Sequence, residues 1–274
     1  MTLGIPKGIY DVVTKRLFPE VMVLPLEQTN QSTLSLSSFK EIKKFLKKVH
    51  CLLIGPGLTQ HISTQALIRK IIGLDALPMV VDADALNALV GHLGILKKSK
   101  QDIVLTPHPK EMARLEGVTS AAIQAARKKV AKDFALRYNK TLILKGFQTI
   151  VSFPGREIYV NKTGNPGMAT AGCGDVLSGI VAAFLGQGMP VFEAARWSVY
   201  LHGLAGDLAA RDKTQVGLIA SDIIEYLPKA FKKIEDRRNL DKIFFYSLFS
   251  IFNFLINFLR YKCRSSSVGR AAVL

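Results

Sequence analysis

The sequence NPGMATAGCGDVLSGIVAAFLGQG, which spans Asn165 to Gly188, decides the fold because a glycine-dense loop runs directly into an apolar helix. The glycines of this loop can adopt backbone conformations with positive φ, so that several N–H groups can turn towards one point. Apolar residues recur at helical spacing from Val176 to Leu185, and we expect the helix to begin at or just after Asp175. Because the N–H groups at a helix start bind anions, the loop is predicted to hold an anion.

Asp175 stands at the junction between the loop and the helix, and two roles are open to it. It can cap the helix, which is the commonest role of Asp at a helix start. It can also act as a base beside a bound phosphate, and the surrounding glycines favour this second role. Cys173 lies in the same loop, but no histidine is near it in the sequence to activate the thiol, so we do not expect it to be a nucleophile.

The composition is that of a basic globular enzyme. The chain has 274 residues, of which 49% are hydrophobic, and this is enough to bury a sizeable core. The net charge is +16, but residues 229–274 hold ten Lys and Arg against three Asp and Glu, or +7 of that excess. We therefore expect neither nucleic acid nor a membrane as a partner. The cysteines at 51, 173 and 263 are too few and too scattered for a disulfide framework or a zinc cluster, so we expect a cytoplasmic protein.

Short apolar runs alternate with amphipathic segments in the first half of the chain. We expect strands at Cys51–Ile54, Pro78–Val81, Ile103–Leu105 and Thr141–Leu144, after two earlier apolar runs at Met1–Pro6 and Val21–Leu26. We expect helices at Phe39–Val49, Ile62–Ile72, Glu111–Glu116 and Ser120–Tyr138. This alternation predicts an α/β fold in which a mostly parallel sheet carries helices on both faces.

The second half of the chain adds a hairpin and three helices. Gln148–Phe153 and Glu157–Val160 flank a turn at Pro154-Gly155, and this spacing predicts a small antiparallel hairpin. Beyond the helix that follows the glycine loop, we expect further helices at Val191–Ala210 and from Ser221 to about Ile234.

Polar motifs follow the predicted parallel strands at their carboxyl ends, which lie at one edge of a parallel sheet. Each motif also has a purely structural interpretation. Asp82 and Asp84 can bind Mg²⁺ or cap the next helix, and the cap is favoured for Asp84. His108 can be a structural histidine, and Lys145 can either lie on the surface or contact a phosphate.

The end of the chain differs from the rest. Ile243–Leu259 is an apolar run of seventeen residues, which is the lower limit for a helix that spans a membrane. Three interpretations are open: a tail anchor, an extra packed or dimerising helix, and a non-native tail from a frameshift or gene rearrangement. We expect one domain at residues 1–234 and an atypical tail at residues 235–274.

Five motifs in order resemble the ADP- or ATP-dependent NAD(P)H-hydrate dehydratase family of the ribokinase-like superfamily. They are GPG, VDADALNAL, LTPHPKEMARL, LKG followed by a Thr, and the glycine loop, and the resemblance covers about Met1 to Leu227. It implies a ribokinase-like three-layer α/β/α fold and a homo-oligomer. It also implies a repair reaction, in which ADP or ATP phosphorylates the added hydroxyl of the S epimer of hydrated NADH or NADPH, and phosphate then leaves to restore the double bond.

The same resemblance assigns roles to residues. Asp175 matches the base that takes the hydroxyl proton, and Gly57 and His108 match positions that contact the hydrate. The positions that match the nucleotide and phosphoryl site are Lys145, Gly146, Phe147, Gln148, Thr149, Gly172, Cys173 and Gly174. Mg²⁺ is implied as a cofactor held mainly by phosphate and water, so no protein ligand is assigned to it.

Two departures from the family pattern lead to further expectations. Family members begin with a strand, a glycine-rich segment and a helix before the point that matches Met1, and we expect this chain to lack them and therefore to fold poorly or act weakly. Cys173 stands where Thr or Ser is usual. Two alternatives remain open, a kinase of the same superfamily acting on a vitamin-precursor alcohol, and a catalytically impaired nucleotide-binding remnant.

Overall fold

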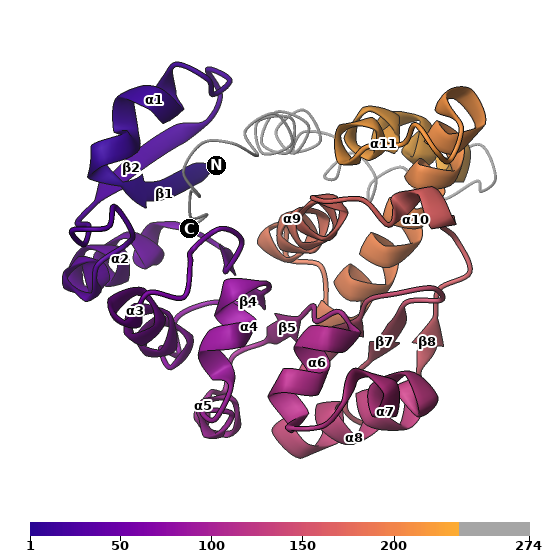
Figure 1. Ribbon diagram of the computed structural model, residues 1–274, viewed down its shortest axis with the longest axis horizontal. Helices are drawn as coiled ribbons and strands as arrows, with labels where there is room; N and C mark the ends of the chain where they lie inside the picture. Colours follow the sequence, from indigo (N-terminus) through magenta and orange to yellow (C-terminus); the bar gives the residue numbers. More distant parts are fainter. Residues whose placement is uncertain (236–274) are drawn as a thin grey trace.

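The computed structural model describes residues 1–235, and the predictions for the tail beyond them, including the apolar run Ile243–Leu259, lie outside the described residues. The strands are β1 (Thr2–Pro6), β2 (Met22–Leu26), β3 (Leu52–Ile54), β4 (Met79–Val81), β5 (Ile103–Leu105), β6 (Thr141–Leu144), β7 (Ile150–Ser152) and β8 (Tyr159–Val160). The α-helices are α1 (Tyr10–Thr14), α2 (Phe39–Phe45), α3 (Ile62–Ile72), α4 (Asp84–Leu89), α5 (Gly94–Lys98), α6 (Pro109–Glu116), α7 (Ser120–Ala125), α8 (Arg127–Tyr138), α9 (Cys173–Gly186), α10 (Val191–Lys213) and α11 (Ala220–Glu235) (Figure 1).

The central sheet has six strands in the order β3-β4-β5-β6-β7-β8. Strands β3 to β6 are parallel, whereas β7 and β8 run antiparallel to their neighbours. The predicted mostly parallel sheet with a small hairpin is therefore confirmed. Because four successive strands are parallel, the segments that follow β3, β4, β5 and β6 all leave the sheet at the same edge.

The order of the parallel strands also fixes the layers. Each connection steps to the next strand in the same direction, and right-handed crossovers of this kind place their helices on one face of the sheet. The strand residues divide accordingly: Leu53, Val80 and Val104 belong to the core cluster that contains α9, α10 and α11. Their neighbours Leu52 and Met79 belong to the cluster that contains α3, α4, α6 and α8. Two helical layers thus enclose the sheet, and the three-layer α/β/α prediction is confirmed (Figure 1).

The first two strands form a sheet of their own. β1 and β2 are parallel, and within the described residues neither hydrogen-bonds to β3. Leu3 and Ile5 of β1 are fully buried in the same core cluster as α9. Leu26 of β2 packs into the cluster on the other face of the sheet. The small sheet therefore continues both layers, and the expectation that a preceding strand is lacking stays a prediction.

Three helix predictions need correction. The predicted single helix from Ser120 to Tyr138 is broken at Ala126, where φ is −134° and ψ is 32°. The helix predicted from Phe39 to Val49 leaves α-geometry after Phe45 and continues as a 3₁₀ turn. The helix after the glycine loop begins at Cys173, earlier than we expected. Among residues 1–235, no helix is both long enough and apolar enough to cross a membrane.

Candidate active site

Lys145, at the end of β6, holds together three segments that leave the sheet at this edge. Its Nζ lies 2.9 Å from Oδ1 of Asp82, which follows β4, and 3.7 Å from Oε2 of Glu111 in α6. Burial alone would lower the pKa of Lys145, but the charges of Asp82, Glu111 and Asp175 outweigh it and the pKa lies above its usual value. The lysine is therefore a charged group at the meeting point of β4, β6 and α6.

The glycine loop brings the start of α9 to the same lysine. Gly172 is the N-cap residue and has φ +87°, a conformation that glycine adopts without strain. A Cβ atom on Gly174 would lie 3.1 Å from Nζ of Lys145, so the helix start and the ammonium group are in direct contact. The N–H groups of the first turn and the ammonium group of Lys145 thus offer hydrogen-bond donors to an anion at one point.

Asp175 occupies the first turn of α9 and does not cap it. The N-cap is Gly172, which makes no side-chain cap hydrogen bond, so of the two roles left open for Asp175 the structure does not bear out the cap. The helix starts early because the left-handed Gly172 reverses the chain before Cys173. Asp175 lies close enough to Lys145 to raise its pKa. The remaining predicted role, a base beside a bound phosphate, stays a prediction.

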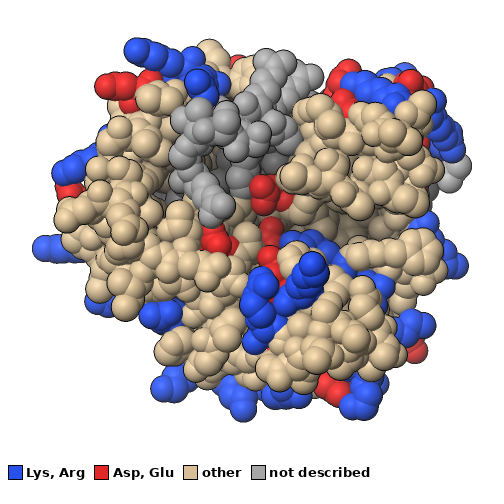
Figure 2. Space-filling view, in the orientation of Figure 1, with Lys and Arg blue, Asp and Glu red and all other residues tan. Residues whose placement is uncertain are grey.

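A cavity of about 700 Å³ opens beside the glycine loop. Among its lining residues are seven of the eight positions predicted for the nucleotide, namely Lys145, Gly146, Phe147, Gln148, Thr149, Cys173 and Gly174. The rest of its wall comes from the segment after β8 and from α10, including Asn161, Asn165, His202 and Gly203. Figure 2 shows acidic and basic side chains side by side around a hollow near the centre of one face of the molecule. The cavity is polar enough on one side to hold a charged ligand.

Two side chains fix the wall that faces the glycine loop. Asp207 in α10 accepts hydrogen bonds from the backbone N–H of Gly164 at 2.9 Å and from Nδ2 of Asn165 at 3.0 Å. Asn161 donates from Nδ2 to the carbonyl of Val199 at 2.9 Å and to that of Thr163 at 3.1 Å. The segment after β8 is thereby tied to α10 along the length of the cavity.

His202 in α10 lies beside the glycine loop, where it lines the cavity and is partly buried. It hydrogen-bonds to the backbone of Cys173, and burial lowers its pKa from 6.5 to about 4. Its Nε2 atom is buried and has no hydrogen-bond partner among residues 1–235, so the bond to Cys173 uses Nδ1. A histidine therefore does lie beside Cys173 in space, although not in sequence, and it contacts the backbone of the cysteine.

Comparison with known protein families shows which family the chain belongs to. The sequence profile of the NAD(P)H-hydrate dehydratase family matches residues 10–229. The chain belongs to the NAD(P)H-hydrate dehydratase family.

Individual relatives agree. The bifunctional NAD(P)H-hydrate repair enzyme Nnr of Moorella thermoacetica is 41% identical over 236 residues, which are 86% of this chain and 44% of that protein. The ADP/ATP-dependent NAD(P)H-hydrate dehydratase of Bacillus subtilis, crystallised with ATP and Mg²⁺, superposes with a TM-score of 0.68 at 26% identity, covering 85% of this chain and 78% of that one. A ribokinase-like superfamily protein from Enterococcus faecalis superposes equally well, with a TM-score of 0.68 at 27% identity over 85% of this chain and 76% of that one. The chain spans less than half of the length of the Moorella relative.

His108, which matches a substrate-contacting position of the family, is the N-cap of α6. Its Nδ1 accepts from the backbone N–H groups of Lys110 at 3.1 Å and Glu111 at 3.2 Å, and Glu111 accepts from the backbone N–H of His108 at 2.7 Å. These reciprocal bonds form a capping box. Burial lowers the pKa of His108, although the nearby charge of Glu111 acts in the opposite direction. The structural interpretation is confirmed, while substrate contact stays a prediction.

Gly57 and the acidic motif after β4 follow parallel strands, so they lie at the same edge of the sheet as Lys145. Gly57, with φ +75°, follows β3 in the Gly-Pro-Gly turn. Oδ2 of Asp84 accepts a hydrogen bond from the backbone N–H of Thr59 at 2.8 Å, which ties this turn to α4. The N-cap of α4 is Ala83 without a side-chain bond, so the predicted capping role of Asp84 is wrong. Asp84 instead positions the loop that carries Gly57.

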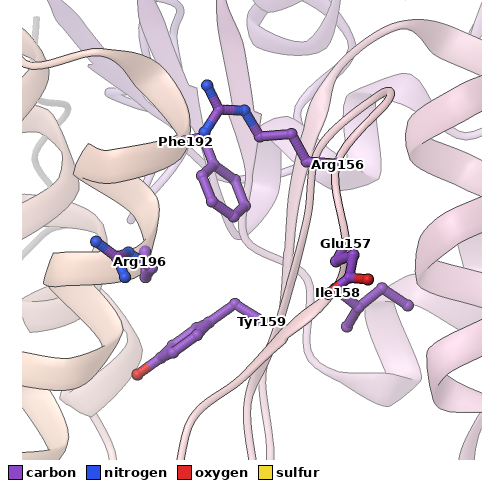
Figure 3. A pocket seen from close by; sticks show the side chains of 6 residues that line it. All are labelled: Arg156, Glu157, Ile158, Tyr159, Phe192 and Arg196. Atoms are coloured by element: carbon purple, nitrogen blue, oxygen red, sulfur yellow. The ribbon is translucent and has the colours of Figure 1, made fainter.

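A second cavity of about 440 Å³ lies away from this edge, between β8 and α10 (Figure 3). Its two arginines are already engaged: the guanidinium of Arg156 lies 5.1 Å from the ring centre of Phe192, and Nη2 of Arg196 lies 2.6 Å from Oε2 of Glu193. Arg156 also approaches Glu193, at 3.8 Å. Both guanidinium groups are therefore held by Glu193 and by an aromatic ring, and none of the residues predicted for the nucleotide lines this cavity.

Sequence reasoning missed three residues of the site. In the sequence, Asp207 and His202 are polar residues within a predicted helix, and Glu111 is one residue of a longer motif. Nothing in these residues themselves indicated that they contact the site. A signal for Asp207 was available, because a carboxylate just after Gly203 and Gly206 in a helix suggests close approach of another segment. A Cβ on Gly203 would indeed lie 2.2 Å from Oγ1 of Thr163.

Proposed function

We propose that this chain uses ADP or ATP to dehydrate the S epimers of hydrated NADH and NADPH, and so restores the reduced nicotinamide coenzymes. One observation carries the proposal: the start of α9, with Asp175 in its first turn, lies against Lys145 at the end of β6. This contact combines helix N–H groups, a cation and a carboxylate at one point. Phosphoryl transfer to a hydroxyl group needs these three elements together.

The nucleotide is assigned to the cavity of about 700 Å³. Its phosphates would lie at the start of α9, where the N–H groups of Gly172, Cys173 and Gly174 and the ammonium of Lys145 stabilise negative charge. The loop from Lys145 to Thr149 forms the adjoining wall. The remainder of the nucleotide extends along Asn161, Asn165 and α10.

The hydrate is assigned to the other side of Asp175, towards the turn of Gly57 and the N-cap His108. Asp175 takes the proton of the added hydroxyl as its oxygen attacks the terminal phosphorus, and the shortened nucleotide leaves. The new phosphate ester then breaks at its C–O bond. Loss of inorganic phosphate and of a proton from the ring restores the carbon–carbon double bond.

Mg²⁺ fits this site as an ion held largely by the nucleotide. No group of three or more His, Cys, Asp or Glu side chains within residues 1–235 is arranged to hold a metal. Oδ2 of Asp82 is buried without a hydrogen-bond partner in the same part of the chain, and a carboxylate oxygen suits a hydrated Mg²⁺. Asp82 and Glu111 would accept hydrogen bonds from water on the ion, and the ion would neutralise phosphate charge. A homo-oligomeric state, supported by the resemblance, and a cytoplasmic location, supported by the few and scattered cysteines, are also part of this proposal.

The test supplies the full chain with the hydrate of NADH, Mg²⁺ and either ADP or ATP. We expect the near-ultraviolet absorbance of the dihydronicotinamide ring to recover while inorganic phosphate is released in equal amount. Absence of recovery with both nucleotides would overturn the proposal. A phosphorylated product that persists without recovery of absorbance would assign the chain to the small-molecule kinases of the same superfamily.

A further inference from the structure

Arg127, the first residue of α8, holds the loop that follows β6 by its backbone. Its Nη2 donates to the carbonyls of Leu144 and Lys145, each at 3.3 Å, and its Nη1 donates to the carbonyl of Phe147. One guanidinium group therefore binds three carbonyls within four residues of the loop. A planar group with five fixed donors can do this, whereas an ammonium group cannot match the geometry.

The tip of this loop has little other support. Gly146, Phe147 and Gln148 are exposed, and Phe147 as a residue is 82% exposed. Gly146 has φ +131° and Gln148 has φ +54°, a conformation that a residue with a side chain adopts at a cost. Within the loop, Oγ1 of Thr149 donates to the carbonyl of Gly146 at 3.0 Å, and the contacts to Arg127 tie this backbone shape to α8.

The guanidinium lies behind the loop as seen from the cavity. Residues 145–149 line the cavity and Arg127 does not. A Cβ on Gly146 would lie 3.2 Å from Nη2 of Arg127, so the glycine permits the guanidinium to approach the backbone closely. Carbonyls that point to Arg127 keep their negative ends away from a phosphate-binding wall, where N–H groups and cations are needed.

Arg127 has no acidic partner. Within residues 1–235 it forms no salt bridge with a carboxylate, and its Nε atom is buried without a hydrogen-bond partner. Arginines elsewhere on the same helix behave differently, since Arg137 pairs with Glu116 at 3.0 Å. The hydrogen bonds of Arg127 described above all go to backbone carbonyls of residues 144–147, so we take its role to be the support of this backbone.

We propose that Arg127 is a positioning residue for the nucleotide, which fixes the shape of the loop from Lys145 to Thr149 without touching the ligand. This inference rests on the proposed function, because it takes the cavity beside the loop as the nucleotide site. It predicts that Arg127 matters for the nucleotide and not for the hydrate, whose assigned contacts lie on the other side of Asp175.

The test compares Arg127→Ala and Arg127→Lys with the full-length parent chain by titration calorimetry with ADP and with ATP, and by steady-state kinetics. For Arg127→Ala we expect the nucleotide Kd and KM to rise about tenfold or more, with the KM for the hydrate and the kcat at saturating nucleotide changed less than about twofold. Arg127→Lys keeps the charge but not the three bonds, and we expect an intermediate Kd. Arg137→Ala, on the exposed face of the same helix, is the matched control and should bind nucleotide as the parent does.

A second variant approaches the contact from the loop. Gly146→Ala places a methyl group against the guanidinium, and we expect the same selective rise in nucleotide Kd; this variant also serves if Arg127→Ala does not fold. Unchanged nucleotide Kd in these variants, or equal losses for nucleotide and hydrate, would overturn the role of Arg127. A parent chain that binds no nucleotide overturns it as well. A parent chain that binds nucleotide but does not turn over the hydrate refutes only the dehydratase proposal, and the Kd values still test Arg127.

Discussion

Nζ of Lys145 lies 2.9 Å from Oδ1 of Asp82, although 63 positions separate the two residues in the sequence. The side chain of Asp82 is only 1% exposed, so this ion pair is removed from water. A buried carboxylate that loses its partner has a large desolvation penalty and little to offset it. The pair therefore links the ends of β4 and β6. Loss of either charge should lower the free energy of unfolding as well as change the site.

Lys145→Met is expected to lower the free energy of unfolding by about 3–5 kcal/mol, because it leaves the charge of Asp82 buried and unpaired. Urea denaturation followed by circular dichroism measures this. The double variant Lys145→Met/Asp82→Asn should recover part of the loss, since no uncompensated charge remains. Lys129→Met removes an exposed ion pair with Asp133 and serves as the control, with an expected loss below about 1 kcal/mol. Equal losses for the two lysine variants would contradict a buried pair at Lys145.

Asp175→Asn is expected to reduce hydrate turnover by a factor of about 10² to 10⁴, because the amide cannot accept the hydroxyl proton. The amide has nearly the same shape as the carboxylate, so the start of α9 should persist and nucleotide binding should change little. Single-turnover kinetics and nucleotide titration separate the two effects. Asp133→Asn, on the exposed face of α8, controls for the loss of a negative charge. Undiminished turnover in Asp175→Asn would remove Asp175 from the mechanism.

Gly55→Ala is expected to prevent stable folding or to cost several kcal/mol. Gly55 has φ +130°, and a Cβ there would lie 1.7 Å from the carbonyl oxygen of Asp82. Gly91 also has positive φ, at +74°, but a Cβ there meets nothing within 4 Å. Gly91→Ala therefore isolates the backbone strain, for which we expect about 1–2 kcal/mol. Thermal unfolding of both variants measures the difference, and similar losses would show that the close approach at Gly55 is unimportant.

The sequence predicted the strand ends and the loop well because these depend on local patterns. Runs such as Ile103–Leu105 and glycines such as Gly172 carry their structural meaning within a few residues. The wrong predictions concern residues whose role depends on contacts with segments distant in the sequence. Asp84 contacts the backbone of Thr59, 25 residues earlier, instead of capping its own helix.

The same limit applies within the site. The role of Asp207 depends on the segment at Gly164 and Asn165, which lies more than forty residues earlier in the chain. Arg127 could not be singled out among the charged residues of α8, because its acceptors are backbone carbonyls, which the sequence does not distinguish. By contrast, the residues from Lys145 to Thr149 were predicted as one group, and they line the cavity together because one loop after one strand carries them all.

The imidazole of His202, whose Nε2 atom is buried, should make the stability of the protein depend on pH. Its pKa in the folded chain is about 4, below the ordinary value of 6.5, because burial disfavours the charged form. Between these values the unfolded chain binds a proton that the folded chain does not, so stability falls as pH decreases from 6.5 to 4 and is fully present above 6.5. The contribution of this one group amounts to about 3 kcal/mol across that range.

His202→Asn removes the titrating group and retains a side-chain amide that can bond to the backbone of Cys173. We expect this variant to be less stable than the parent at neutral pH, because the smaller side chain loses the packing of the imidazole, and the difference should shrink as the pH falls below 6.5. Urea midpoints measured at half-unit intervals of pH give both curves. Parallel curves for the parent and the variant would mean that His202 titrates alike in the folded and unfolded chains, and its position beside the glycine loop would then have no electrostatic consequence.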